Sequence, residues 1–115
     1  MARHHQITFL NEFPNLSYVN EIAGTDRDFA PRFINLLKEE FRWEVGMYLR
    51  HIRNRQPREA AEIVRKSKYK FSMLGLFQSY IFADSYEQHL RSGNANFHAD
   101  FRKILEKVNS FLAKV

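Results

Sequence analysis

Five side chains between residues 61 and 72 have the spacing of a single helix face: Ala61, Arg65, Lys68, Tyr69 and Ser72. Steps of three and four residues bring side chains together on one side of an α-helix. Arginine and lysine on such a face pair with carboxylates or phosphates, and arginine and tyrosine are frequent at the centre of protein interfaces. The spacing therefore indicates a surface that binds an acidic partner.

Helices must position these side chains, because apolar residues recur at three- and four-residue steps and strand alternation is absent. The pattern predicts helices over about 14–23, 26–54, 57–74, 78–91 and 96–113. Four long helices with short connections favour an antiparallel bundle. We therefore predict an all-α fold: an antiparallel four-helix bundle over residues 14–115 with a short extra N-terminal helix, preceded by an arm over residues 1–13.

Composition limits the class of protein. The 115 residues, 44% of them hydrophobic, suit one domain with one core. The absence of cysteine excludes disulfides, zinc–thiolate sites and cysteine nucleophiles. No apolar run approaches the roughly 18 residues of a membrane span, and the N-terminal residues lack the apolar stretch of a signal peptide. These features predict a cytoplasmic protein.

The charge is basic and unevenly placed. The net charge is +5, and eight lysines and arginines lie between Arg50 and Lys70 against only Glu59 and Glu62. Such a balance favours acidic partners, which include nucleic acid, an anionic surface or an acidic protein pocket. No base-reading module is evident. The charge alone therefore allows nucleic acid or an unrelated acidic protein as a partner. We keep these as the alternative to a partner that a motif implies.

The segment from Ile63 to Leu76 resembles the signature of histidine-phosphotransfer domains. That signature is a histidine followed three residues later by lysine, then by small residues and a Leu–Gly pair. Lys68 matches the lysine, Ser72 falls among the small positions, and Leu74 and Gly75 match the pair. The order of the helices agrees as well, so the resemblance extends over about residues 14–113.

Two positions depart from the signature: Arg65 occupies the place of the phosphorylated histidine, and Tyr69 a place that is commonly glycine. Phosphoryl acceptance requires a neutral nitrogen with a lone pair, which imidazole has near neutral pH. A guanidinium stays protonated and offers donors but no acceptor. The sequence therefore predicts a degenerate family member that does not carry phosphate.

The resemblance implies that the face around Arg65 docks the acidic pocket of a response-regulator receiver domain, or a histidine kinase, as an adaptor or inhibitor. Arg65 and Lys68 would then enter the pocket as fixed cations. Arg65 could also be an exposed residue without a role, and Lys68 could serve solubility alone. Tyr69 could anchor the partner or lie along the bundle surface.

Other chemistry finds little support in the sequence. None of His51, His89 and His98 is followed three residues later by lysine, so none is expected to accept phosphate. The adjacent His4 and His5 lack a third metal ligand. Glu40 and Glu44 are attributed to a solvated helix face, and no serine has a neighbouring His–Asp pair. We therefore predict no enzymatic activity, no metal and no cofactor.

Overall fold

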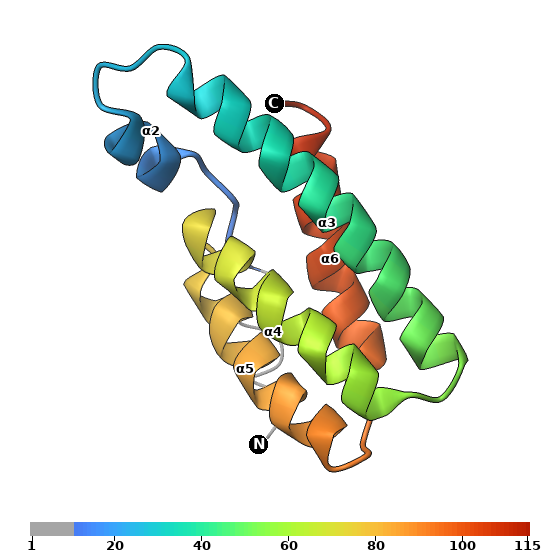
Figure 1. Ribbon diagram of the computed structural model, residues 1–115. Coiled ribbons are helices and arrows are strands. Elements are labelled where there is room, and N and C mark those ends of the chain that lie inside the picture. Colours follow the sequence, from blue (N-terminus) through green and yellow to red (C-terminus); the bar gives the residue numbers. More distant parts are fainter. Residues whose placement is uncertain (1–10) are drawn as a thin grey trace.

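The computed structural model describes residues 11–115, which form five helices joined by short turns (Figure 1). The helices are α2 (Ser17–Ala23), α3 (Phe29–Arg53), α4 (Pro57–Met73), α5 (Phe77–Arg91) and α6 (His98–Leu112). This part of the chain contains no strand. The prediction of an all-α fold is confirmed, and each predicted helix begins and ends within three residues of an observed one.

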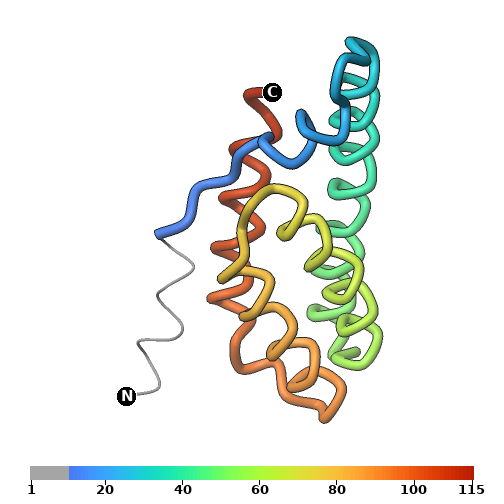
Figure 2. Tube along the Cα trace, turned by 90° about the vertical axis from the view of Figure 1, so that its left-hand side faces the viewer, coloured from blue at the N-terminus to red at the C-terminus, as the bar shows by residue number. Residues whose placement is uncertain are grey.

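The short turns make consecutive long helices run in opposite directions (Figure 1). Helix α4 packs along α5 on one side and along α3 on the other, and α6 contacts α3. Helix α2 lies beside the beginning of α3, near the turn that follows α4 (Figure 2). No helix among residues 11–115 combines the length and the apolar character that a membrane crossing requires.

Aromatic rings fill the interior between the four long helices. The ring of Phe101 in α6 lies 4.9 Å from that of Tyr48 in α3, 5.3 Å from that of Tyr86 in α5 and 5.9 Å from that of Phe71 in α4, between centroids. All four side chains are almost completely buried. Burial of an aromatic side chain is a large apolar contribution to stability, so this cluster fixes the helices relative to one another.

The turn between α4 and α5 is held by residues from before α2. Gly75 has a φ of 80°, and a Cβ at this position would lie 2.5 Å from the Asn15 side-chain amide nitrogen, so any other residue would strain the backbone and displace Asn15. The Glu12 carboxylate accepts hydrogen bonds from the backbone N–H groups of Gln78 and Ser79 at the start of α5. Residues 1–10 of the predicted arm, with His4 and His5, lie outside the described residues.

A chain of hydrogen bonds crosses the core and ends at His98. The Tyr48 hydroxyl lies 2.8 Å from the Tyr86 hydroxyl and 2.8 Å from His98 Nδ1. With a neutral imidazole that carries its proton on Nε2, Tyr48 donates to Nδ1 and accepts from Tyr86, so each group has a partner. Burial raises the pKa of Tyr86 to about 12 and, with help from nearby Arg102, lowers the pKa of His98 below its ordinary value.

His98 should make stability depend on pH. Its folded pKa lies below the unfolded value of 6.5, so the unfolded chain binds a proton more readily and the free energy of unfolding falls as the pH drops below about 6.5. We expect His98→Asn, whose amide can replace Nδ1, to lose less stability than the unmodified protein between about pH 7.5 and about pH 5.5. Denaturant titrations at both pH values measure this, and parallel losses would contradict it.

Candidate functional site

Arg65 lies on the solvent-exposed side of α4 and pairs with a carboxylate one turn back. Its Nε donates to Glu62 Oε2 at 3.2 Å. The other oxygen of Glu62 accepts from an amino group of Arg91 on α5 at 3.3 Å. The hydrogen bonds from Arg65 and then Arg91 hold the pKa of Glu62 below its usual value, so this carboxylate is ionised at neutral pH. The cation predicted to enter a partner's pocket is therefore already paired within the chain.

Lys68 is bound to two carboxylates of α5. Its Nζ donates to Asp84 at 2.6 Å and to Glu87 at 2.9 Å, and the lysine is only 6% exposed. Burial by itself would lower the pKa of Lys68, but the hydrogen bonds to Asp84 and Glu87 outweigh it and raise that pKa above its ordinary value. The ammonium group is thus charged and directed at α5 rather than at solvent.

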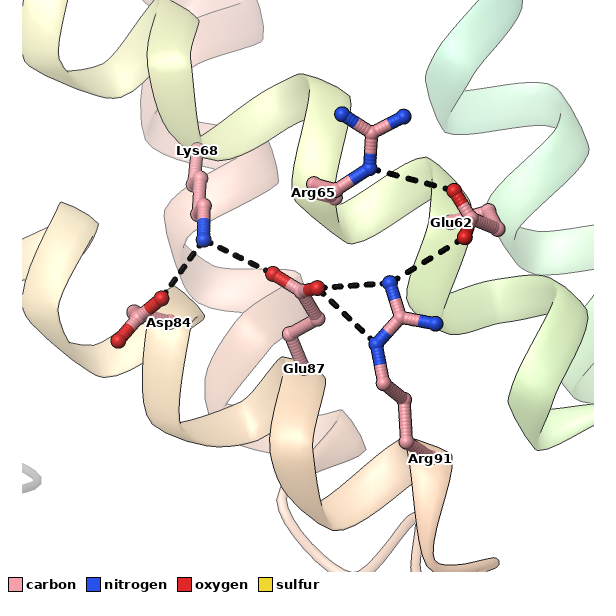
Figure 3. Close-up of polar contacts among 6 residues, drawn as sticks. All are labelled: Glu62, Arg65, Lys68, Asp84, Glu87 and Arg91. Atoms are coloured by element: carbon pink, nitrogen blue, oxygen red, sulfur yellow. Dashed lines mark hydrogen bonds and ion pairs between the residues drawn. The ribbon is translucent and has the colours of Figure 1, made fainter.

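Glu87 joins these two pairs into one network. Its second oxygen accepts from Arg91 Nε at 3.1 Å and from an amino group of Arg91 at 2.7 Å. The result is an alternating series across α4 and α5 (Figure 3): Asp84, Lys68, Glu87, Arg91, Glu62 and Arg65. Three cations balance three carboxylates, so the charge network is neutral as a whole, and Arg65 forms one exposed end of it.

The face predicted from helical spacing is only partly accessible. Ala61 is completely buried and Lys68 nearly so, whereas Arg65 and Tyr69 are exposed and Ser72 is half-buried. The reason is that α4 is flanked by both α3 and α5, which leaves a narrow exposed strip along it. Ala61 and Lys68 therefore do not lie on an open docking face as the sequence indicated.

Exposed aromatic side chains surround that strip. Two shallow surface hollows meet at Tyr69: one is also lined by Trp43 and Arg65, the other by Tyr18 and Phe77. These four aromatic side chains are between 47% and 63% exposed. The sequence indicated Tyr69 but not the other three aromatic residues. The available signal was that Trp43 and Phe77 do not fall on the apolar helix faces that are predicted to point into the core.

A second buried ion pair fastens α4 to α3. Lys70 Nζ lies 2.6 Å from Glu44 Oε2 and 3.0 Å from Glu40 Oε1. The Ser67 hydroxyl donates to the remaining Glu44 oxygen at 3.0 Å. Because Glu44 is only 4% exposed, the prediction that Glu40 and Glu44 share a solvated face is wrong for Glu44. The error arose because a carboxylate can lie inside when a lysine from another helix reaches it.

The basic stretch from Arg50 to Lys70 divides into two parts in the fold. Arg65, Lys68 and Lys70 are in ion pairs, and Lys66 Nζ lies 5.5 Å from the centroid of the Trp43 ring. The remaining members lie around the turn between α3 and α4 and form no ion pair within residues 11–115: Arg50, Arg53, Arg55 and Arg58.

The exposed strip along α4 and the charge network beside it offer cations, carboxylates and aromatic rings for binding. Within residues 11–115, no group of three or more histidines and carboxylates is placed to hold a metal ion. Comparisons with protein-family models, with curated proteins and with solved structures find no match. The chemistry of the exposed strip along α4 is therefore the basis for a function.

Proposed function

We propose that the chain is a cytoplasmic, non-enzymatic member of the histidine-phosphotransfer class, built as an antiparallel four-helix bundle with α2 as its extra helix. It docks a response-regulator receiver domain or a histidine kinase without carrying phosphate, as an adaptor or inhibitor in phosphorelay signalling. The observation that carries this proposal is Arg65, a cation at the phosphoacceptor position that is exposed and bordered by Trp43 and Tyr69.

The charges of the strip suit a carboxylate-lined pocket better than a phosphoryl group. Arg65 has no lone pair for phosphorus, and the signature lysine is committed to Asp84 and Glu87. A partner carboxylate could take the place of Glu62 on Arg65, because both side chains are half-exposed and exposed ion pairs contribute little to stability. Trp43 and Tyr69 would supply the apolar contact that interface centres commonly contain.

Receiver binding should respond to Arg65 in a charge-dependent way. In calorimetric titrations of receiver domains from the same genome, we expect Arg65→Glu to weaken binding about fivefold, since it places a carboxylate against the partner's acidic pocket. Unchanged affinity would contradict the proposal. The rate of receiver phosphorylation by a phosphodonor, measured with and without this protein, separates an inhibitor, which blocks the reaction, from an adaptor, which leaves it unaltered.

Glu62 provides the reciprocal test. Glu62→Gln releases Arg65 from its internal partner, so we expect roughly two- to fivefold tighter binding, the value of an exposed pair. Glu59→Gln removes the same charge one turn earlier on α4, outside the charge network, and should have a smaller effect. Equal effects of the two substitutions would show that net charge alone, and not Arg65, governs binding.

A further inference from the structure

Four exposed arginines gather at the end of the molecule where α3 passes into α4. This arginine end consists of Arg50, Arg53, Arg55 and Arg58, and residues 50–58 include no acidic residue. Arg65, Lys68, Lys70 and Arg91 are all paired with carboxylates, whereas the arginine end forms no ion pair within the described part of the chain. It is the densest group of unpaired cations along residues 11–115.

Arg55 occupies a backbone conformation that arginine does not favour. Its φ is 56°, and it is the one residue other than glycine with a positive φ among residues 11–115. The turns after α2, α4 and α5 also contain a residue with a positive φ, but in each of them it is a glycine, which has no Cβ: Gly24, Gly75 and Gly93. A side chain in left-handed geometry costs free energy that glycine avoids. The turn itself therefore gives no reason for arginine at this position.

Arg58 is unfavourably placed for a different reason. It is the second residue of α4, where the helix dipole presents its positive end and favours acidic side chains. Its Nε donates to the backbone oxygen of Arg91 at the end of α5 at 3.3 Å, which holds the guanidinium at this end of the molecule. Two neighbouring arginines thus oppose local preferences, a pattern expected where function outweighs stability.

We propose that the arginine end binds the phosphate backbone of nucleic acid without reading bases. Guanidinium groups match phosphate oxygens in paired hydrogen bonds, and all four cations here are arginine rather than lysine. The large apolar side chains that are exposed within residues 11–115 include none between residues 44 and 68. Side chains for insertion into lipid, or for the apolar centre of a protein interface, are therefore lacking at this end.

This inference goes beyond the proposed function and does not depend on it. The turn between α3 and α4 lies at the opposite end of α4 from α2 and the turn into α5 (Figure 1). Tyr18, Tyr69 and Phe77 border the second hollow there, toward the α2 end. The exposed strip along α4 and the arginine end are therefore separate surfaces, so one molecule could bind a protein partner and a nucleic acid at the same time.

Fluorescence anisotropy with a mixed-sequence duplex of about 20 base pairs tests the proposal. About four phosphate contacts predict that the logarithm of the binding constant falls with the logarithm of salt concentration with a slope of about −3.6. We expect Arg55→Gly to weaken binding roughly fivefold at about 0.1 M salt and to make the slope shallower by about one. The same substitution should not lower the midpoint of thermal unfolding, because it removes the left-handed arginine.

Two further variants make the test specific. Arg53→Gln should reproduce the loss of affinity and of slope, whereas Arg42→Gln removes another exposed arginine of α3, outside the arginine end, and should leave both nearly unchanged. No binding at about 50 mM salt, or an equal loss with Arg42→Gln, would overturn the proposal. Vesicles containing anionic phospholipid that bind with the same dependence on Arg55, while the duplex does not, would overturn it in favour of a membrane surface.

Discussion

Replacing Lys70 with methionine is expected to lower the free energy of unfolding by about 3 kcal/mol, because it leaves a buried carboxylate without its cation. Lys70 Nζ lies 2.6 Å from Glu44 Oε2, and both residues are less than 10% exposed. Glu44 would retain the hydrogen bond from Ser67, which keeps the expected loss at the lower end of the range for broken buried pairs. Urea denaturation followed by circular dichroism measures the change.

A double variant separates the ion pair from the packing of the two side chains. Glu44→Leu combined with Lys70→Met removes both charges and should recover most of the stability, since an apolar pair of similar volume often replaces a buried ion pair without loss. The Ser67 hydroxyl can then donate to the backbone oxygen one turn back. Lys66→Met, at an exposed neighbouring position, should cost less than about 1 kcal/mol. Equal losses for Lys66→Met and Lys70→Met would contradict this account.

The helices were predictable because each depends on the spacing of apolar residues within one stretch of chain. Phe41, Tyr48 and Phe101 recur on the inward faces, and all three are buried as that spacing requires. Gly24, Gly75 and Gly93 lie at helix ends and adopt the positive φ that such ends favour. Local patterns of this kind need no knowledge of which helix packs against which.

The charge network was not predictable, because its pairs join residues distant in the sequence. Lys68 and Glu87 are 19 positions apart, and only the packing of α4 against α5 brings them within 2.9 Å. Helical spacing placed Ala61 and Lys68 on the same face as Arg65, but spacing does not show that neighbouring helices cover part of that face. For the same reason Glu44 was predicted to lie in solvent, whereas it is buried in an ion pair with Lys70 from another helix.

The charge network also determines which charges around Arg65 are available to a ligand. In a histidine-phosphotransfer domain, a single replacement of histidine by arginine would remove phosphate acceptance and leave the surrounding charges unaltered. Here Lys68 is already neutralised by two carboxylates, and Glu62 pairs with Arg65 itself. The Lys68 ammonium group, which would offset the charge of a phosphoryl group, is therefore already paired. The carboxylate nearest position 65 is paired with the arginine. These contacts support the proposal that the site binds a partner and does not transfer a phosphoryl group.

Introducing histidine at position 65 should therefore not be sufficient to create a phosphate acceptor. In Arg65→His, a phosphorylated imidazole would lie near Lys68, whose Nζ is held by Asp84 at 2.6 Å and Glu87 at 2.9 Å. Coulomb's law gives roughly 3 kcal/mol for like unit charges about 6 Å apart at an effective dielectric constant near 20. Because Asp84 is half-exposed, solvent reduces its repulsion to about 1.4 kcal/mol, which is about tenfold in rate.

The double variant Arg65→His with Asp84→Asn should thus accept phosphate about tenfold faster than Arg65→His alone. The amide can still accept a hydrogen bond from Lys68, so the lysine keeps its position while its charge is less fully offset. Incubation with phosphoramidate followed by detection of phosphohistidine measures the rate. Arg65→Gln with Asp84→Asn is the matched control, since it lacks the acceptor and shows any labelling of the other histidines. Equal labelling of the single and double variants would mean that the Asp84 charge does not oppose phosphate acceptance.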